Sequence, residues 1–148
     1  MKEILGNIWD FHAQGNWIVI TTNGVVKRDG SAVMGRGVAE QAKARFPDLA
    51  FALGKKLTRS GNHVWTFSKF KIVTFPVKQV WQKPAHLDLI RQSCLELNSL
   101  FSAINIEPLY IVRPGCGNGQ LAWSEVRPIL ISHIDPKHDL TVVNNESG

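Results

Sequence analysis

Residues 31–39 read SAVMGRGVA, and they follow a strongly apolar segment, residues 17–20, after which Asn23 stands. A second glycine-rich stretch, residues 115–119, reads GCGNG and follows another apolar segment, residues 109–112. Glycine lets backbone N–H groups approach a ligand closely, and the start of a helix adds a favourable field for anions. Two such loops in one small domain predict a clamp for a diphosphate.

The composition is that of a single globular domain. At 148 residues, 44% of them hydrophobic, the chain is long enough to bury a substantial core. No apolar run approaches the ~20 residues that span a membrane, and the charged start of the chain does not resemble a signal peptide. Cys94 and Cys116 provide no disulfide framework and fit a reducing compartment. We therefore expect a cytoplasmic monomer without a membrane partner, with one domain over residues 1–143 and a polar tail over 144–148.

Positive charge is concentrated in the first 60 residues, which hold nine Lys and Arg against five Asp and Glu. The excess lies near Lys27 and Arg28 and on Lys55, Lys56 and Arg59. A basic surface attracts nucleic acid, and it also raises the encounter rate with small phosphorylated ligands. Nucleic acid therefore stays open as a partner, and a merely solvated basic surface is the alternative.

The chain alternates between strand and helix patterns. Strands are expected near the N-terminus and at residues 17–20, 64–67, 72–75, 109–112 and 140–143. Helices are expected at residues 36–46, 48–59 and 86–103. A further helix is expected to be capped by Ser124, with Pro128 in its first turn. This order predicts an α/β domain whose mixed or mostly parallel sheet is covered by helices on both sides.

Four segments come just after predicted strands. They are Asn23, residues 33–38, residues 75–78 and residues 114–121. In sheets of this kind, ligands bind in a crevice at the carboxyl ends of the strands. We therefore expect these segments to converge on one edge of the sheet.

Two familiar nucleotide-binding motifs are absent. Gly35 and Gly37 lack the third glycine of a dinucleotide fingerprint, because Glu40 stands at that position. No Gly-Lys-Ser/Thr follows residues 24–30, so the chain has no Walker lysine.

Metal and thiol chemistry are also not expected. His133, Asp135 and His138 are close in sequence, but Pro136 and the polar context favour a surface turn, so neither a metal nor a cofactor is predicted. Cys116 is interpreted as a small side chain filling space between glycines, rather than as a nucleophile.

Taken together, the loop motifs resemble the macro domain. The matching segments are residues 6–9 (GNIW), Asn23, residues 34–39 (MGRGVA), residues 115–119 (GCGNG) and residues 123–126 (WSEV), in the order and spacing of that family. The resemblance covers nearly the whole chain. It implies a three-layer α/β/α fold with a central mixed sheet, binding ADP-ribose in the crevice.

One branch of that family is especially similar. The MGRG form, and residues 75–78 (FPVK) followed by Trp81 and Pro84, resemble the branch with the terminal ADP-ribose protein glycohydrolase and the DNA ADP-ribosyl glycohydrolase antitoxin of DarTG. In that branch Lys78 matches the catalytic lysine, which attacks the anomeric carbon of the distal ribose. A lysine at a strand tip can have a depressed pKa and act as a nucleophile.

The resemblance also assigns ligand-binding roles. Asn7 and Ile8, with Trp9 beside them, match the segment that recognises adenine, and Asn23 matches the asparagine that holds the distal ribose. The first diphosphate loop is matched by Gly35, Arg36, Gly37 and Val38, and the second by Gly115, Cys116, Gly117, Asn118 and Gly119. Met34 and Pro114, which precede these loops, are also expected to bind the ligand.

The chain differs from that branch at several positions where the family has acidic residues. Gly119 stands where the protein-directed member has an aspartate that assists its lysine, and Ala122 replaces the common acid of the second loop. Glu125 is the nearest downstream carboxylate and is expected on a helix. Val77 replaces the usual threonine before the lysine, and Asn7 stands where the family often has an acid.

Taken singly, these residues have simpler interpretations. Asn23 alone favours a turn-closing role, Met34 core packing and Lys78 a solvated surface position. Trp9, Trp81 and Trp123 alone would be core or rim aromatic residues. Only their occurrence together favours a ligand site.

Three functions remain open from the sequence. The first is a hydrolase that removes ADP-ribose from a macromolecule, DNA or protein, through Lys78. The second is a reader that binds ADP-ribose or an ADP-ribosylated partner without turnover, which the absent acids favour. The third is a basic nucleic-acid-binding domain whose glycine loops are structural.

Overall fold

The computed structural model describes residues 1–145, which form six strands and five helices. The strands are β1 (Lys2–Gly6), β2 (Trp17–Thr22), β3 (Thr66–Phe67), β4 (Ile72–Pro76), β5 (Leu109–Val112) and β6 (Leu140–Asn145). The helices are α1 (Ile8–Ala13), α2 (Val38–Arg45), α3 (Pro47–Ser60), α4 (Leu87–Ala103) and α5 (Trp123–His133).

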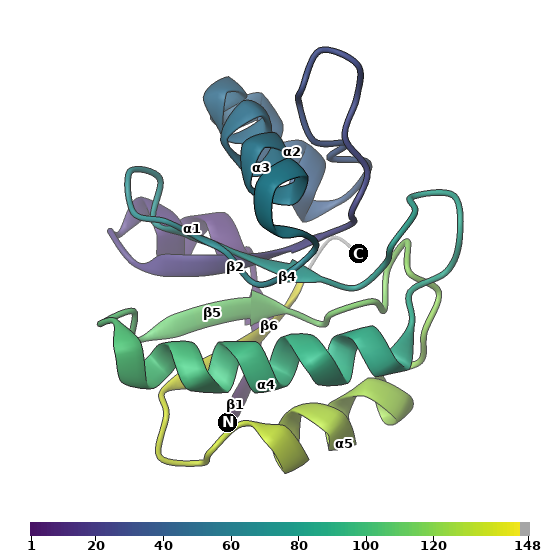
Figure 1. Ribbon diagram of the computed structural model, residues 1–148. Coiled ribbons are helices and arrows are strands. Elements are labelled where there is room, and N and C mark those ends of the chain that lie inside the picture. The colour runs from purple at the N-terminus through teal and green to yellow at the C-terminus, as the bar shows by residue number, and fades with distance from the viewer. Residues whose placement is uncertain (146–148) are drawn as a thin grey trace.

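All six strands form one sheet in the order β1-β6-β5-β2-β4-β3. Neighbouring strands are parallel except for β3, which pairs antiparallel with β4. The mixed sheet predicted from the sequence is therefore confirmed. Because the five longer strands are parallel, their carboxyl ends lie along one edge, at the right of the sheet in Figure 1.

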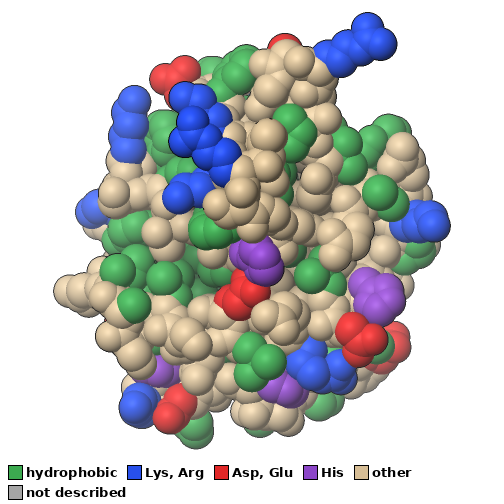
Figure 2. All heavy atoms as spheres, viewed as in Figure 1, with side chains coloured by type: hydrophobic (Ala, Val, Ile, Leu, Met, Phe, Trp, Pro, Cys, Tyr) green, Lys and Arg blue, Asp and Glu red, His purple; other side chains and the backbone are tan. Residues whose placement is uncertain are grey.

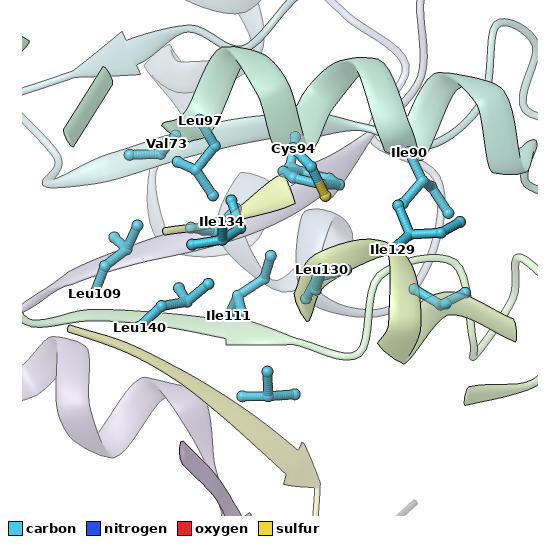
Figure 3. Close-up of a cluster of buried hydrophobic side chains, with 14 of the residues drawn as sticks. Val73, Ile90, Cys94, Leu97, Leu109, Ile111, Ile129, Leu130, Ile134 and Leu140 are labelled. Atoms are coloured by element: carbon cyan, nitrogen blue, oxygen red, sulfur yellow. The ribbon is translucent and has the colours of Figure 1, made fainter. Parts of the chain in front are cut away.

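Helices cover both faces of this sheet, as Figure 1 shows: α1, α2 and α3 on one face, α4 and α5 on the other. Side chains alternate along a strand, so Ile18 and Ile20 of β2 enter the core under α1–α3, whereas Val19 enters the core under α4 and α5. Figure 3 shows the second core, where Cys94 and Leu97 of α4 meet Leu130 and Ile134 from the α5 side. The fold is thus a three-layer α/β/α sandwich.

Most predicted elements are present, with shifted ends. The helix expected at residues 36–46 begins only at Val38, because Gly37 has a φ of 65° that a helix cannot contain. Pro47 opens α3, since its missing N–H is unneeded in a first turn. The short helix α1 was not predicted. Among residues 1–145, no helix is long and apolar enough to cross a membrane.

The C-terminal strand is longer than expected. β6 runs to Asn145 because Asn144 and Asn145 stay in register with Leu5 and Gly6 of β1. These two residues were predicted to belong to a polar tail. The rest of that tail, residues 146–148, lies outside the described residues.

Two details predicted for α5 are wrong. Its N-cap is Ala122 rather than Ser124, and the Oε1 of Glu125 accepts a hydrogen bond from the N–H of Ala122 at 3.3 Å. Glu125 therefore binds the N–H of the N-cap residue, which is the half of a capping box that needs no serine hydroxyl. Pro128 is consequently the sixth residue of α5, beyond its first turn, and it is tolerated because both it and Ser124 are exposed to water.

Candidate functional site

A cleft of about 820 Å³ opens at the carboxyl edge of the sheet. Its walls come from the ends of β1, β2, β4, β5 and β6 and from the start of α2. The structure therefore brings together the four segments that follow predicted strands. A volume of this size is typical of a site for a nucleotide-sized ligand.

The two glycine loops face each other across this cleft. A Cβ built on Gly37 would lie 3.5 Å from the Asn118 side-chain nitrogen, so the loops approach to van der Waals distance. Within residues 1–145, the N–H groups of Gly35, Gly37 and Gly117 donate to no other group. Unpaired N–H groups on both sides, with the start of α2 behind one of them, form a cradle for an anion.

The second loop is held in place by its own backbone. The N–H of Leu121 donates to the Gly115 carbonyl at 2.9 Å, and Gly115 has a φ of 75° that favours glycine. A Cβ on Gly119 would overlap the backbone of Gly115, so no larger residue fits there. The Gly119 carbonyl accepts from the N–H of Ala85 at 2.9 Å, which ties this loop to the segment after Lys78.

Lys78 follows β4 directly and lines the cleft. Its Nζ lies 3.4 Å from the backbone oxygen of Asn118, to which it donates. Burial lowers the pKa of the Lys78 amine below its usual range, and the positive charge of Arg36 lowers it further. Lys78 is thus a half-buried amine with an increased neutral fraction, next to the anion cradle.

Asn23 has the turn-closing role that its position after a strand predicts. Its Oδ1 accepts from the N–H of Val25 at 2.9 Å, and its Nδ2 donates to the Val33 carbonyl at 3.0 Å. The side chain therefore closes the loop that leads to Gly35, as an asparagine after a strand often does. It is buried and lines the same cleft, and one of its two amide hydrogens is not used by these bonds.

The predicted ligand-binding residues divide into two groups. Those that line the cleft are Asn7, Ile8, Asn23, Gly35, Arg36, Gly37, Val38, Gly115, Cys116, Gly117, Asn118 and Gly119. Trp9, Met34 and Pro114 are buried and do not line it. Trp9 instead joins α1 to α2, because its indole N–H donates to Gln41 at 2.8 Å and Arg45 lies over its ring at 4.3 Å.

Asn7 caps α1, its Oδ1 accepting from the N–H of Trp9 at 3.0 Å. Its side-chain oxygen is therefore partly used within the protein, and the NH₂ group stays available to a ligand. Cys116 is not poised as a nucleophile, since burial raises the pKa of its thiol to about 11. Its S–H donates to the Pro114 carbonyl at 3.5 Å.

Charge in the cleft has one sign. Arg36, Lys78, Lys83 and Arg113 line it, and no Asp or Glu of the described residues does. Glu125 is occupied at the start of α5, as expected from its position on that helix. The basic residues of α3 do not line the cleft, although Figure 2 shows a group of Lys and Arg side chains over the α2–α3 layer.

Sequence reasoning missed several residues of the cleft. Arg113 lies directly after β5, the same position relative to a strand that singled out Asn23 and Lys78, so that rule applied consistently would have found it. Asn144 and Asn145 were missed because they were placed in a tail rather than at the end of β6. Gln41 gave no signal, since it lies within a helix.

Comparison with known proteins agrees with this geometry, although no protein-family model matches the chain. The solved macrodomain of Mycobacterium tuberculosis DarG is 27% identical, with a TM-score of 0.76 over 98% of each chain. The macrodomain of Thermus aquaticus DarG is 26% identical, with a TM-score of 0.77 over 98% of this chain and 97% of that one. Thermosipho africanus DarTG in complex with ADP-ribose, 17% identical with a TM-score of 0.75, shares the fold over 90% of this chain and 39% of that one.

Similar proteins with curated names agree with the structural comparison. A DNA ADP-ribosyl glycohydrolase of Mycobacterium tuberculosis is 28% identical over 120 residues, 75% of this chain and 34% of that protein. One from Thermus aquaticus is 28% identical over 136 residues, 86% of this chain and 36% of that protein. The chain spans about a third of the length of these relatives.

By its sheet order, its glycine-loop cleft and these similarities, the chain has the fold of a macro domain. Within that class it resembles the DarG macrodomains, which confirms the branch inferred from the MGRG and FPVK segments.

Proposed function

We propose that the cleft binds ADP-ribose and that the chain removes ADP-ribose from DNA, with Lys78 as the catalytic residue. The observation that carries this proposal is the position of Lys78. Its amine, with a lowered pKa, lines the cleft 3.4 Å from the second glycine loop. The names of the curated relatives, DNA ADP-ribosyl glycohydrolases, support the same activity.

In this proposal the diphosphate lies between the two glycine loops, where unpaired N–H groups face Arg36 and Lys78. Adenine lies against Asn7 and Ile8 at the end of β1. The distal ribose lies beside Asn23, which places its anomeric carbon within reach of Lys78.

The proposed reaction begins with the neutral amine of Lys78. A bond forms between Nζ and the anomeric carbon while the bond from that carbon to the modified base breaks, and the base leaves with the bonding electron pair. The new C–N bond leaves a positive charge on Nζ, which loses a proton to water. The ring C–O bond then breaks with proton transfer from water to the ring oxygen, giving a protonated lysine Schiff base. Water then adds to the same carbon, which releases the amine and free ADP-ribose, so the net change is hydrolysis.

The missing acids restrict the leaving group. No carboxyl group of residues 1–145 lines the cleft, so no side-chain acid there can protonate a poor leaving group. This favours groups that depart as stabilised anions, such as an imide nitrogen of a nucleobase or a carboxylate. The absence of acids also supports the alternative function, a reader that binds ADP-ribose without turnover.

A turnover panel tests this proposal. The chain is incubated with single-stranded DNA carrying ADP-ribosyl thymidine, with a peptide carrying ADP-ribosyl glutamate and with 1″-phosphorylated ADP-ribose, and released ADP-ribose is measured. We expect release from the DNA. Binding without release from any substrate would favour the reader.

A competition assay tests the third function, a nucleic-acid-binding domain with structural glycine loops. Free ADP-ribose should displace an ADP-ribosylated strand, because both occupy the cleft. Strand binding that free ADP-ribose does not weaken would favour the third function.

We also propose a cytoplasmic location, which the two unpaired cysteines, Cys94 and Cys116, support.

A further inference from the structure

Trp81 differs from the other tryptophans of this chain. It lines the cleft and is 51% exposed, next to Val80 at 37%. Trp9 is buried, and Trp17, Trp65 and Trp123 are half-buried. Within residues 1–145, no group accepts a hydrogen bond from the Trp81 indole and no ring or cation packs on it. A large aromatic surface thus stands uncovered at the entrance.

The positive charge of the cleft that Trp81 lines exceeds what a diphosphate needs. ADP-ribose brings one negative charge on each of its two phosphates, whereas Arg36, Lys78, Lys83 and Arg113 all line the cleft. None of the four forms an ion pair with an acidic side chain of the described residues. Lys83 lies two residues after Trp81 and is exposed, so its charge remains available outside the diphosphate cradle.

An exposed aromatic ring beside unpaired cations is the combination that binds single-stranded nucleic acid, because bases stack on the ring and phosphates pair with the cations. We propose that residues 79–83 hold the strand that carries the ADP-ribose, with Trp81 stacking on a base next to the modified nucleotide and Lys83 contacting a phosphodiester. This rests on the proposed function and assigns residues 79–83 as the part of the site that contacts the strand outside the ADP-ribose cleft.

The segment is suitably anchored for this role. The Val77 carbonyl accepts from the N–H of His86 at 2.8 Å, which closes the loop that contains Trp81. On the other side, Asn62 donates to the Lys78 carbonyl and to the Gln79 side chain, both at 3.0 Å. The ends of the loop are therefore fixed while the ring of Trp81 faces solvent.

The test compares ligands with and without a strand. Lys78→Ala is used as the background, so that the strand is not cleaved, and Trp81→Ala is added to it. The ligands are single-stranded DNA carrying one ADP-ribosyl thymidine, a peptide carrying ADP-ribosyl glutamate, and free ADP-ribose. We expect Trp81→Ala to weaken binding of the strand by roughly 5- to 150-fold, the range that one lost stacking contact gives. That loss should exceed the loss on free ADP-ribose and on the peptide by at least about fivefold.

Conservative and matched variants separate stacking from a structural effect. Trp81→Phe should restore most of the affinity for the strand, and Lys83→Gln should reduce the slope of log affinity against log salt by about 0.7. Phe51→Ala removes an equally exposed aromatic ring, 47% exposed on α3 and outside the cleft, and should affect all three ligands equally.

Equal losses of affinity for the strand and free ADP-ribose in the Trp81→Ala variant would overturn the inference, as would a larger loss on the peptide. Suppose that the unsubstituted chain binds free ADP-ribose while Trp81→Ala weakens strand binding no more than it weakens binding of free ADP-ribose. In that case the proposed strand contact is wrong and the proposed function stands. If it does not bind free ADP-ribose, both fail.

Discussion

Lys78 carries the whole catalytic proposal, because no carboxyl group of the described residues lines the cleft with it. Replacing it with alanine leaves the glycine loops intact, so we expect ADP-ribose affinity to change by less than about threefold while turnover falls by about 10³-fold or more. Lys78→Arg should also be inactive, since a guanidinium stays protonated and cannot attack carbon. Calorimetry and release of ADP-ribose from modified DNA give the two measurements. A Lys78→Ala chain that cleaves at the native rate would end the lysine mechanism.

A second prediction, on the pH dependence of kcat, follows from the lowered pKa of Lys78. Its pKa is lowered by burial and, to a smaller extent, by the positive charge of Arg36. The reactive species is the neutral amine, so kcat should increase with pH and level off above that lowered pKa. Arg36→Gln removes one of the two causes, and the rise in kcat should therefore move to higher pH.

Lys83→Gln is the control for that pH profile, because Lys83 lines the same cleft but is not a cause of the lowered pKa. Its rise in kcat should stay where the native one lies. A profile that moves equally in both variants would mean that general surface charge, rather than Arg36, acts on the amine.

At the scale of elements, the second glycine loop can be tested without disturbing the fold. A Cβ on Gly117 would meet nothing within 4 Å, and its φ lies outside the left-handed region. Gly117→Glu should therefore fold normally, yet its carboxylate would occupy the anion cradle and repel the diphosphate. We expect ADP-ribose affinity to fall by more than about 100-fold, with a smaller loss for the uncharged Gly117→Gln. Native affinity in Gly117→Glu would show that the phosphates bind elsewhere.

Gly37 is a less suitable position than Gly117 for the same test. Its φ of 65° strains any side chain, so Gly37→Glu would mix a backbone effect with the charge effect.

Another glycine controls how α3 packs. Gly54 lies in that helix, and a Cβ there would overlap the carbonyl oxygen of Gly30 in the loop before the first glycine loop. The Ala32 N–H donates to the Ala50 carbonyl at 2.8 Å in the same place, so neither backbone can move freely. Gly54→Ala should lower the free energy of unfolding by about 1–3 kcal/mol or more, measured by urea denaturation. Gly35→Ala, whose Cβ meets nothing within 4 Å, is the control and should be near neutral.

The elements that the sequence predicts well are those whose own residues determine them. The helix at residues 86–103 has its apolar residues at three- and four-residue steps, and α4 is observed at Leu87–Ala103. The short α1 could not be predicted this way, because six residues are too few to establish a period. The end of β6 depends on a partner far away in the sequence, through the pairing of Asn145 with Gly6, whereas the start of α5 depends on the bond from the Ala122 N–H to Glu125.

The same distinction holds for the site. Glycine loops and a lysine after strands carry local signals, and the structure brings them into one cleft. Trp9 and Met34 carry signals that fit either the core or a ligand, and only packing shows that they lie outside the cleft wall. Gln41 joins the cleft because of how α2 is oriented, which its own neighbours in the sequence do not determine.

At the scale of the whole molecule, the cleft joins the two layers of helices. The first glycine loop leads into α2 over one core, whereas the second is tied through Ala85 to the segment before α4 over the other core. A diphosphate bound between the loops would thus bridge both layers. Its binding energy should then appear as resistance of the entire domain to unfolding, because the unfolded chain has no such cradle.

This bridging predicts the size of a thermal shift. At a ligand concentration about 100 times Kd, binding to the folded state alone adds about 2.7 kcal/mol. For a domain of this length that corresponds to a rise in Tm of roughly 5–10 °C, measured by calorimetry in a single transition. Hydrogen exchange should slow at the same time at the amides of Gly35, Gly37 and Gly117, which donate to no other group of the described residues. The Gly117→Glu chain, at the same ligand concentration, should show neither effect. A native-sized rise in Tm there would place the ligand outside the loops, and protection of one loop without the other would mean that the diphosphate does not bridge the layers.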